Sequence, residues 1–187
     1  PASMVDDGYR DFADRWNPIL DVFDEIGVRF AHEVHPSEIA YDYWTTVRTM
    51  EAIGHREAFG LNWDPSHFVW QDLDPVGFLW DFKDRIYHVD CKESTKQLNG
   101  RNGRLGSHLP WGDPRRGWDF VSTGHGDVPW EPVFRAEART GELWLILPSE
   151  PDGFDAEPAL QPMAGGCWRV GDDRLGARDP RGSLHPR

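Results

Sequence analysis

The segment Leu61-Asn62-Trp63-Asp64-Pro65-Ser66-His67 decides the predicted fold. It continues the strand predicted over Glu57–Leu61, whose apolar run indicates burial. Asp64 and His67 follow three residues apart, just before a loop. A carboxylate and an imidazole directly after a strand can bind a metal ion and a substrate oxygen. The alternative is that Asp64 caps the turn at Pro65 and His67 lies on the surface.

Two other segments repeat this arrangement of a short buried strand that ends in a metal-ligand type of residue. In Phe30-Ala31-His32-Glu33-Val34-His35-Pro36, Glu33 follows an apolar strand predicted over Val28–Phe30. In Ile86-Tyr87-His88-Val89-Asp90, His88 lies at the end of a strand predicted over Arg85–Val89. Each has a structural alternative: Glu33 as a rim carboxylate paired with His32 or His35, and His88 as a satisfied core histidine.

Helical patterns separate the three strands. Apolar residues recur at three- and four-residue spacing before each strand, and the predicted helices cover residues 9–26, 42–53 and 74–83. The order helix-strand, repeated three times with short connections, favours parallel strands with crossover helices. Because parallel strands end at one mouth of an α/β barrel, we predict a metal site at that mouth.

The pattern loosens after the third strand. Residues 93–126 are rich in turn residues and predict a long loop, and a loop of this length is usually functional or mobile. A helix is expected over 130–139 and a last strand over 143–147. Residues 148–187 hold six Pro, six Gly and five Arg without any periodicity, which predicts an irregular tail, disordered or translated out of frame.

Composition narrows the class of protein. At 187 residues with 39% hydrophobic residues, the chain has room for one domain with a core. The formal charge of −12 argues against a nucleic-acid partner, since phosphate binding needs clustered Lys and Arg. No apolar run has the length of a membrane span. Two cysteines, Cys91 and Cys167, form no zinc pattern. We expect a soluble, cytoplasmic protein.

The candidate ligands also indicate which metal would bind. Two carboxylates and one neutral imidazole form a hard, mostly oxygen site. Such a site suits Mn²⁺, Mg²⁺ or Co²⁺, and Zn²⁺ is compatible with it. Asp90 and Lys92, alternate from His88 along the chain, are candidates to orient the imidazole or to bind substrate.

Four strings of the sequence, AHEVHP, GLNWDPSH, YHVDCKE and GHGDVPWEPVFRA, resemble the sugar phosphate isomerase/epimerase family with the xylose isomerase-like TIM barrel. The resemblance covers roughly residues 1–136 and is specific to the superfamily, not to a substrate. It implies that Glu33, Asp64 and His88 bind one divalent metal and that Glu33 also acts in acid–base catalysis. It implies that His67 binds substrate. An arginine of related epimerases falls on Ser94, so Lys92 is expected to replace that substrate contact.

The resemblance also implies an incomplete barrel. The sequence corresponds to strands five to eight, the C-terminal half, within residues 1–147. The fourth metal ligand of relatives, a glutamate after the last strand, has a candidate in Glu150, although its neighbours do not match.

The implied activity is isomerisation or epimerisation of a sugar or sugar phosphate, by proton transfer next to a carbonyl through a metal-stabilised enediolate. The expected partner is a small molecule, and a homo-oligomer is compatible with the sequence. Two alternatives stay open: an inactive barrel fragment that needs a partner chain, and a metal-dependent hydrolase or endonuclease-IV-like phosphodiesterase.

Overall fold

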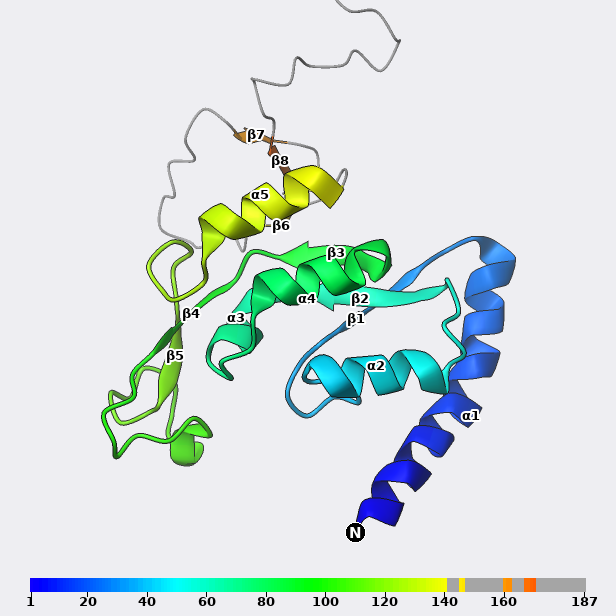
Figure 1. Ribbon diagram of the computed structural model, residues 1–187, viewed down its shortest axis with the longest axis horizontal. Helices are drawn as coiled ribbons and strands as arrows, with labels where there is room; N and C mark the ends of the chain where they lie inside the picture. Colours follow the sequence, from blue (N-terminus) through cyan, green and yellow to red (C-terminus); the bar gives the residue numbers. More distant parts are fainter. Residues whose placement is uncertain (141–144, 147–159, 163–166, 171–187) are drawn as a thin grey trace, which may run out of the picture.

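In a computed structural model of the chain, residues 1–140, 145–146, 160–162 and 167–170 are described. Helices and strands alternate over the first ninety residues (Figure 1): α1 (Ala2–Ile26), β1 (Phe30–Glu33), α2 (Tyr43–Ala52), β2 (Phe59–Trp63), α3 (Pro65–Val69), α4 (Pro75–Phe82) and β3 (Ile86–Asp90). The later elements are β4 (Glu93–Lys96), β5 (Trp118–Val121), α5 (Trp130–Thr140), β6 (Leu145–Ile146), β7 (Leu160–Pro162) and β8 (Cys167–Val170). Single 3₁₀ turns cover Lys83–Arg85 and Gly106–His108.

The main sheet confirms the predicted α/β arrangement. Its strand order is β1-β2-β3-β6-β8-β7, and β1, β2, β3 and β6 are mutually parallel. Strand β6 lies within the predicted strand 143–147. Strand β8 pairs antiparallel with β6, and β7 pairs antiparallel with β8. Both strands lie in the segment 148–187, for which only an irregular tail was expected. The rest of that segment lies outside the described residues, so the domain boundary at 147 stays a prediction.

The region 93–126 differs from the predicted loop. It contains an antiparallel hairpin of β4 and β5, in which Ser94 pairs with Phe120 and Lys96 with Trp118. Each strand has four residues, and Gly- and Pro-rich turns separate them, so no window long enough for a strand pattern exists. The hairpin stands away from the main sheet (Figure 1).

Local capping explains where the helices begin and end. Asp42 begins α2 with a capping box, because its carboxylate accepts from Thr45 N at 2.8 Å while Thr45 Oγ1 accepts from Asp42 N at 2.9 Å. Asp64 and Asp74 begin α3 and α4, each followed by a proline at the first helical position. Gly27 ends α1 at φ 66°, a left-handed conformation that suits glycine.

Helix α1 is a single helix that contains Pro18. Asn-Pro is a pair that often starts a helix, but here the helix continues through Asn17 and Pro18. Proline has no backbone N–H to donate to the carbonyl four residues earlier, that of Asp14. The neighbouring Asn17 side chain donates to Ala13 O at 2.9 Å. No helix in the described part of the chain has the length and apolarity to cross a bilayer.

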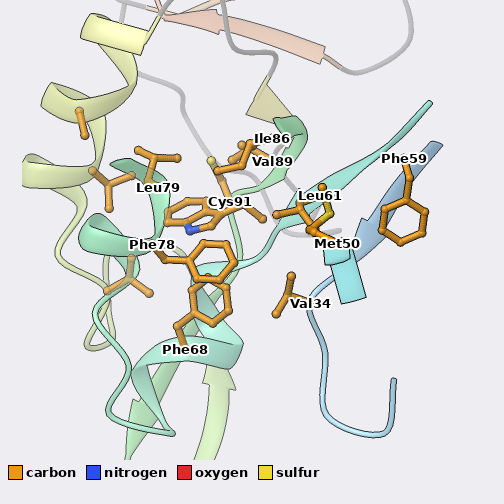
Figure 2. Close-up of a cluster of buried hydrophobic side chains, with 14 of the residues drawn as sticks. Val34, Met50, Phe59, Leu61, Phe68, Phe78, Leu79, Ile86, Val89 and Cys91 are labelled. Atoms are coloured by element: carbon orange, nitrogen blue, oxygen red, sulfur yellow. The ribbon is translucent and has the colours of Figure 1, made fainter. Parts of the chain in front are cut away.

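The core lies between the sheet and its covering helices. Alternate residues of β2, namely Phe59, Leu61 and Trp63, have no exposed surface. Figure 2 shows Leu61 of β2 and Val89 of β3 beside the cluster of Phe68, Phe78 and Leu79 from α3 and α4. Full burial of side chains of this size stabilises the fold by about 1.5–3 kcal/mol each. Since side chains alternate along a strand, the intervening residues of β2 lie on the opposite face.

Candidate metal centre at the strand ends

The sheet register places polar side chains in one row on the face opposite the core. Glu33 of β1 pairs with Asn62 of β2, and Asn62 pairs with His88 of β3. Paired residues of parallel strands point to the same side. His88 Nδ1 lies 2.8 Å from Asn62 Oδ1, and the Asn62 amide donates to Asp90 Oδ2 at 3.1 Å.

At the same end of the strands, the structure brings together Glu33, Asp64 and His67, which we call the triad. One potential ligand atom of each residue lies within 4.8 Å of the others. His67 Nε2 is 3.4 Å from Asp64 Oδ2 and 3.7 Å from Glu33 Oε1. The three residues come from the end of β1, the end of β2 and the first turns of α3.

The position of Asp64 depends on the start of α3. Its Oδ1 accepts hydrogen bonds from Ser66 N at 2.9 Å and Ser66 Oγ at 2.6 Å. This N-cap leaves Oδ2 facing His67. The capping role that the sequence offered as an alternative to metal binding is therefore present, and it involves only one of the two carboxylate oxygens.

His67 is a buried imidazole whose ring nitrogens both lack a hydrogen-bond partner among the described residues. Burial lowers its pKa to about 4, although the Asp64 carboxylate acts in the opposite direction. At neutral pH the ring is therefore uncharged, so one nitrogen carries a lone pair that can bind a cation. The His35 ring lies edge-on to it, with ring centroids 4.3 Å apart.

Lys92 extends its ammonium group into the same site. Its Nζ is 2.8 Å from Asp64 Oδ2 and 3.9 Å from Glu33 Oε1. Burial disfavours the charged lysine, but the two carboxylates outweigh burial and the pKa of Lys92 is raised. Burial also raises the pKa of Glu33, against the attraction of the Lys92 ammonium.

The other two candidate ligands from the sequence are His88 and Glu150. His88, predicted as a ligand, is not part of the triad and contacts Asn62 and Asp90 instead. Its assignment stays a prediction. Glu150, the candidate fourth ligand, lies outside the described residues.

Sequence reasoning missed two further features of this region. Glu93 is a buried carboxylate that accepts hydrogen bonds from Gly124 N, Val128 N and Trp130 Nε1. The Phe120 ring lies 5.8 Å from the His67 ring. The alternation Trp118-Asp119-Phe120 was a signal for a strand, but nothing in the sequence indicated that this strand would lie beside His67.

The chemistry of the triad fits a divalent cation. It offers two carboxylates and a neutral imidazole, a donor set that such ions accept. Asp64 is fully buried and its Oδ2 lies 2.8 Å from Lys92 Nζ, while both ring nitrogens of His67 lack a hydrogen-bond partner among the described residues. Unsatisfied buried polar atoms are rare in folded proteins, and a bound cation would give one nitrogen of His67 a partner.

Comparison with known proteins identifies the class. Residues 2–165 match the family described as xylose isomerase-like TIM barrel. The chain belongs to this family.

Two curated relatives show how the chain compares with longer proteins. It is 30% identical to the rhizopine catabolism protein MocC of Rhizobium meliloti over 135 residues, which are 72% of this chain and 40% of MocC. It is 24% identical to an inosose dehydratase of Clostridium botulinum over 162 residues, 83% of this chain and 54% of that protein. The chain thus spans about half of its relatives' length or less.

Solved structures support the same fold. The probable 3-DHS dehydratase AsbF of Bacillus anthracis superposes with a TM-score of 0.59 at 17% identity, over 75% of this chain and 50% of AsbF. The IolI protein, whose structure contains a zinc atom, superposes with a TM-score of 0.52 at 17% identity, over 72% of this chain and 45% of IolI. Both matches cover about half of the longer chain, as expected for part of a barrel.

Proposed function

We propose that this chain carries a divalent-metal site for proton transfer at a carbon next to a carbonyl group of a sugar or related polyol. The observation that carries the proposal is the triad, in which two carboxylates and a neutral, unsatisfied imidazole converge at the strand ends. Family membership and the zinc atom in the IolI structure support a metal centre in this fold.

Glu33 and Asp64 would hold the cation together with one imidazole. His67 already faces both carboxylates. His88 is the alternative donor: its Nδ1–H donates to Asn62 Oδ1, which leaves the Nε2 lone pair to bind a cation. When bound, the cation supplies positive charge that favours the negative charge developing on the substrate oxygens. Its identity among Mn²⁺, Mg²⁺, Co²⁺ and Zn²⁺ is open.

The proton would move to Glu33. Burial raises the pKa of this carboxyl above its usual range, which brings it closer to the value at which a carboxylate exchanges protons readily. As Glu33 takes the proton from the carbon, the electron pair forms a carbon–carbon double bond and the carbonyl becomes an enolate oxygen. Lys92 would donate a hydrogen bond to a substrate oxygen from its position beside Asp64.

Three outcomes can follow this first step. If the deprotonated carbon carries a hydroxyl group, its O–H proton can move to the enolate oxygen while the carbon-bound proton returns to the former carbonyl carbon, which gives isomerisation. Return of the proton to the opposite face of the same carbon gives epimerisation. Loss of a hydroxyl group from the next carbon, with a proton to form water, gives dehydration. We propose isomerisation or epimerisation for the whole protein. Dehydration is the second candidate, because relatives named inosose dehydratase share the family.

The common first step can be tested by hydrogen exchange. We expect the metal-loaded chain to incorporate deuterium from heavy water next to the carbonyl of a ketose or keto-inositol, measured by NMR. Glu33→Gln should abolish the exchange, whereas Glu38→Gln on the exposed loop should not change it. Metal binding by the folded chain without exchange on any tested substrate would favour the inactive fragment.

A further inference from the structure

Two aromatic side chains of the hairpin region are exposed beside the triad. Phe120 on β5 is 38% exposed and Trp111, in the turn before β5, is 58% exposed. Their ring centroids are 5.0 Å apart with an interplanar angle of 34°. We call this pair the aromatic wall. Aromatic surface left in water next to a polar site often marks a ligand-binding surface.

Buried residues hold the wall in place. Trp118, the neighbour of Phe120 on the same face of β5, is buried and stacks on Trp70 with centroids 4.7 Å apart and planes 2° apart. The Arg116 guanidinium lies 3.8 Å from the centroid of the Trp111 ring. The Asp119 carboxylate accepts from Gly112 N at 2.5 Å, which ties the Trp111 turn to β5. These contacts make the wall a fixed surface.

The wall continues directly into the triad. The Phe120 ring lies 5.8 Å from the His67 ring at an interplanar angle of 88°. Lys92 Nζ lies 5.1 Å from the Phe120 centroid and 2.8 Å from Asp64 Oδ2. A ligand that touches Phe120 is therefore within reach of the ammonium and carboxylate groups.

We propose that the aromatic wall stacks against the C–H face of a carbocyclic polyol that carries a ring carbonyl, and that the hydroxyl groups of this ring point to Lys92 and the triad. This proposal rests on the proposed function and adds the substrate class. A ring presents its C–H bonds as one flat apolar face, which matches a rigid aromatic surface. An open-chain polyol would have to lose conformational freedom to present such a face.

The test compares myo-inositol with sorbitol, an open-chain polyol with the same numbers of carbons and hydroxyl groups. Saturation-transfer NMR is run on the full chain with Mg²⁺ and without metal. We expect saturation to reach the ring C–H protons of inositol, and inositol to bind more tightly than sorbitol. Phe120→Leu and Trp111→Leu should each weaken inositol binding about 3- to 10-fold. Phe134→Leu, a change at a 36% exposed phenylalanine on α5, should leave it unchanged.

Three outcomes would overturn the proposal. Absence of inositol binding both with and without Mg²⁺ would do so, and so would equal binding of sorbitol. If the Phe120 and Trp111 variants instead change the sedimentation coefficient, a second copy of the chain covers the wall. Mg²⁺ affinity is measured separately by calorimetry and should be equal in wild type and Phe120→Leu. Loss of metal binding in the wild type would therefore count against the proposed function and not against the wall.

Discussion

At the residue scale, the buried His67 imidazole makes the stability of the chain depend on pH. Its folded-state pKa is lowered from 6.5 to about 4, so between these values the unfolded chain binds more protons than the folded chain. The free energy of unfolding should therefore fall as pH decreases through this window. From pH 7.5 to 5, the wild type should lose about 2 kcal/mol more than His67→Gln in urea unfolding. Equal losses in both proteins would contradict a buried neutral His67.

Lys92 competes with a metal ion for the same oxygen. The Lys92 ammonium lies 2.8 Å from Asp64 Oδ2. A cation that binds Asp64 therefore has to displace this ammonium group or bind next to its positive charge. We expect Lys92→Met to bind Mn²⁺ about 10-fold more tightly, equivalent to about 1.4 kcal/mol. Lys96→Met is the matched control, since Lys96 is also 34% exposed and pairs with Asp72 at 2.9 Å. Weaker Mn²⁺ binding by Lys92→Met would mean that Lys92 supports the site instead.

The sequence indicated the residues of the triad better than their roles. Glu33, Asp64 and His67 could be singled out because each lies at or just after a predicted strand end. Which imidazole would face the carboxylates depends on α3, a helix of five residues that no periodicity could predict. The aromatic wall and Glu93 could not be predicted as site features, because their positions depend on contacts across the hairpin.

At the element scale, Glu93 joins β4 to the start of α5. Its carboxylate accepts from Val128 N at 2.9 Å and Trp130 Nε1 at 2.6 Å, and a Cβ at Gly126 would lie 2.6 Å from its Oε1. In Glu93→Gln an amide N–H₂ would face these donors. We expect a loss of about 2–4 kcal/mol in unfolding free energy, measured by urea denaturation. The control Glu131→Gln, at an exposed surface pair, should change it by less than about 0.5 kcal/mol. Equal stability of the two variants would contradict a structural role for Glu93.

Element types followed from the sequence where the pattern was long enough. The helices α1, α2 and α4 have apolar periodicity together with Asp-Pro, Asp or Gly signals at their ends. Strand β1 extends through His32 and Glu33 because it pairs with β2, a tertiary effect that local apolarity does not reveal. Strands β4 and β5 were missed because their side chains alternate over only four residues.

At the scale of the whole molecule, a bound metal should stabilise the fold. A ligand that binds only the folded chain adds RT ln(1 + [L]/Kd), about 2.7 kcal/mol at a concentration of 100 Kd. We therefore expect EDTA to lower the midpoint of thermal unfolding and Mn²⁺ to restore it. In Asp64→Asn neither addition should have an effect. A midpoint that EDTA leaves unchanged in the metal-loaded wild type would contradict coupling between this site and the fold.

The most direct test of the account is a calorimetric titration of the metal-stripped chain with Mn²⁺. We predict one-to-one binding that Asp64→Asn abolishes. Asp74→Asn is the control, because Asp74 also caps a helix before a proline and accepts from Val76 N at 3.0 Å, but is not part of the triad. His67→Gln and His88→Gln, titrated in parallel, identify the imidazole ligand. Absence of Mn²⁺ binding in a folded wild-type chain, or equal binding by Asp64→Asn and Asp74→Asn, would contradict a metal centre at these strand ends.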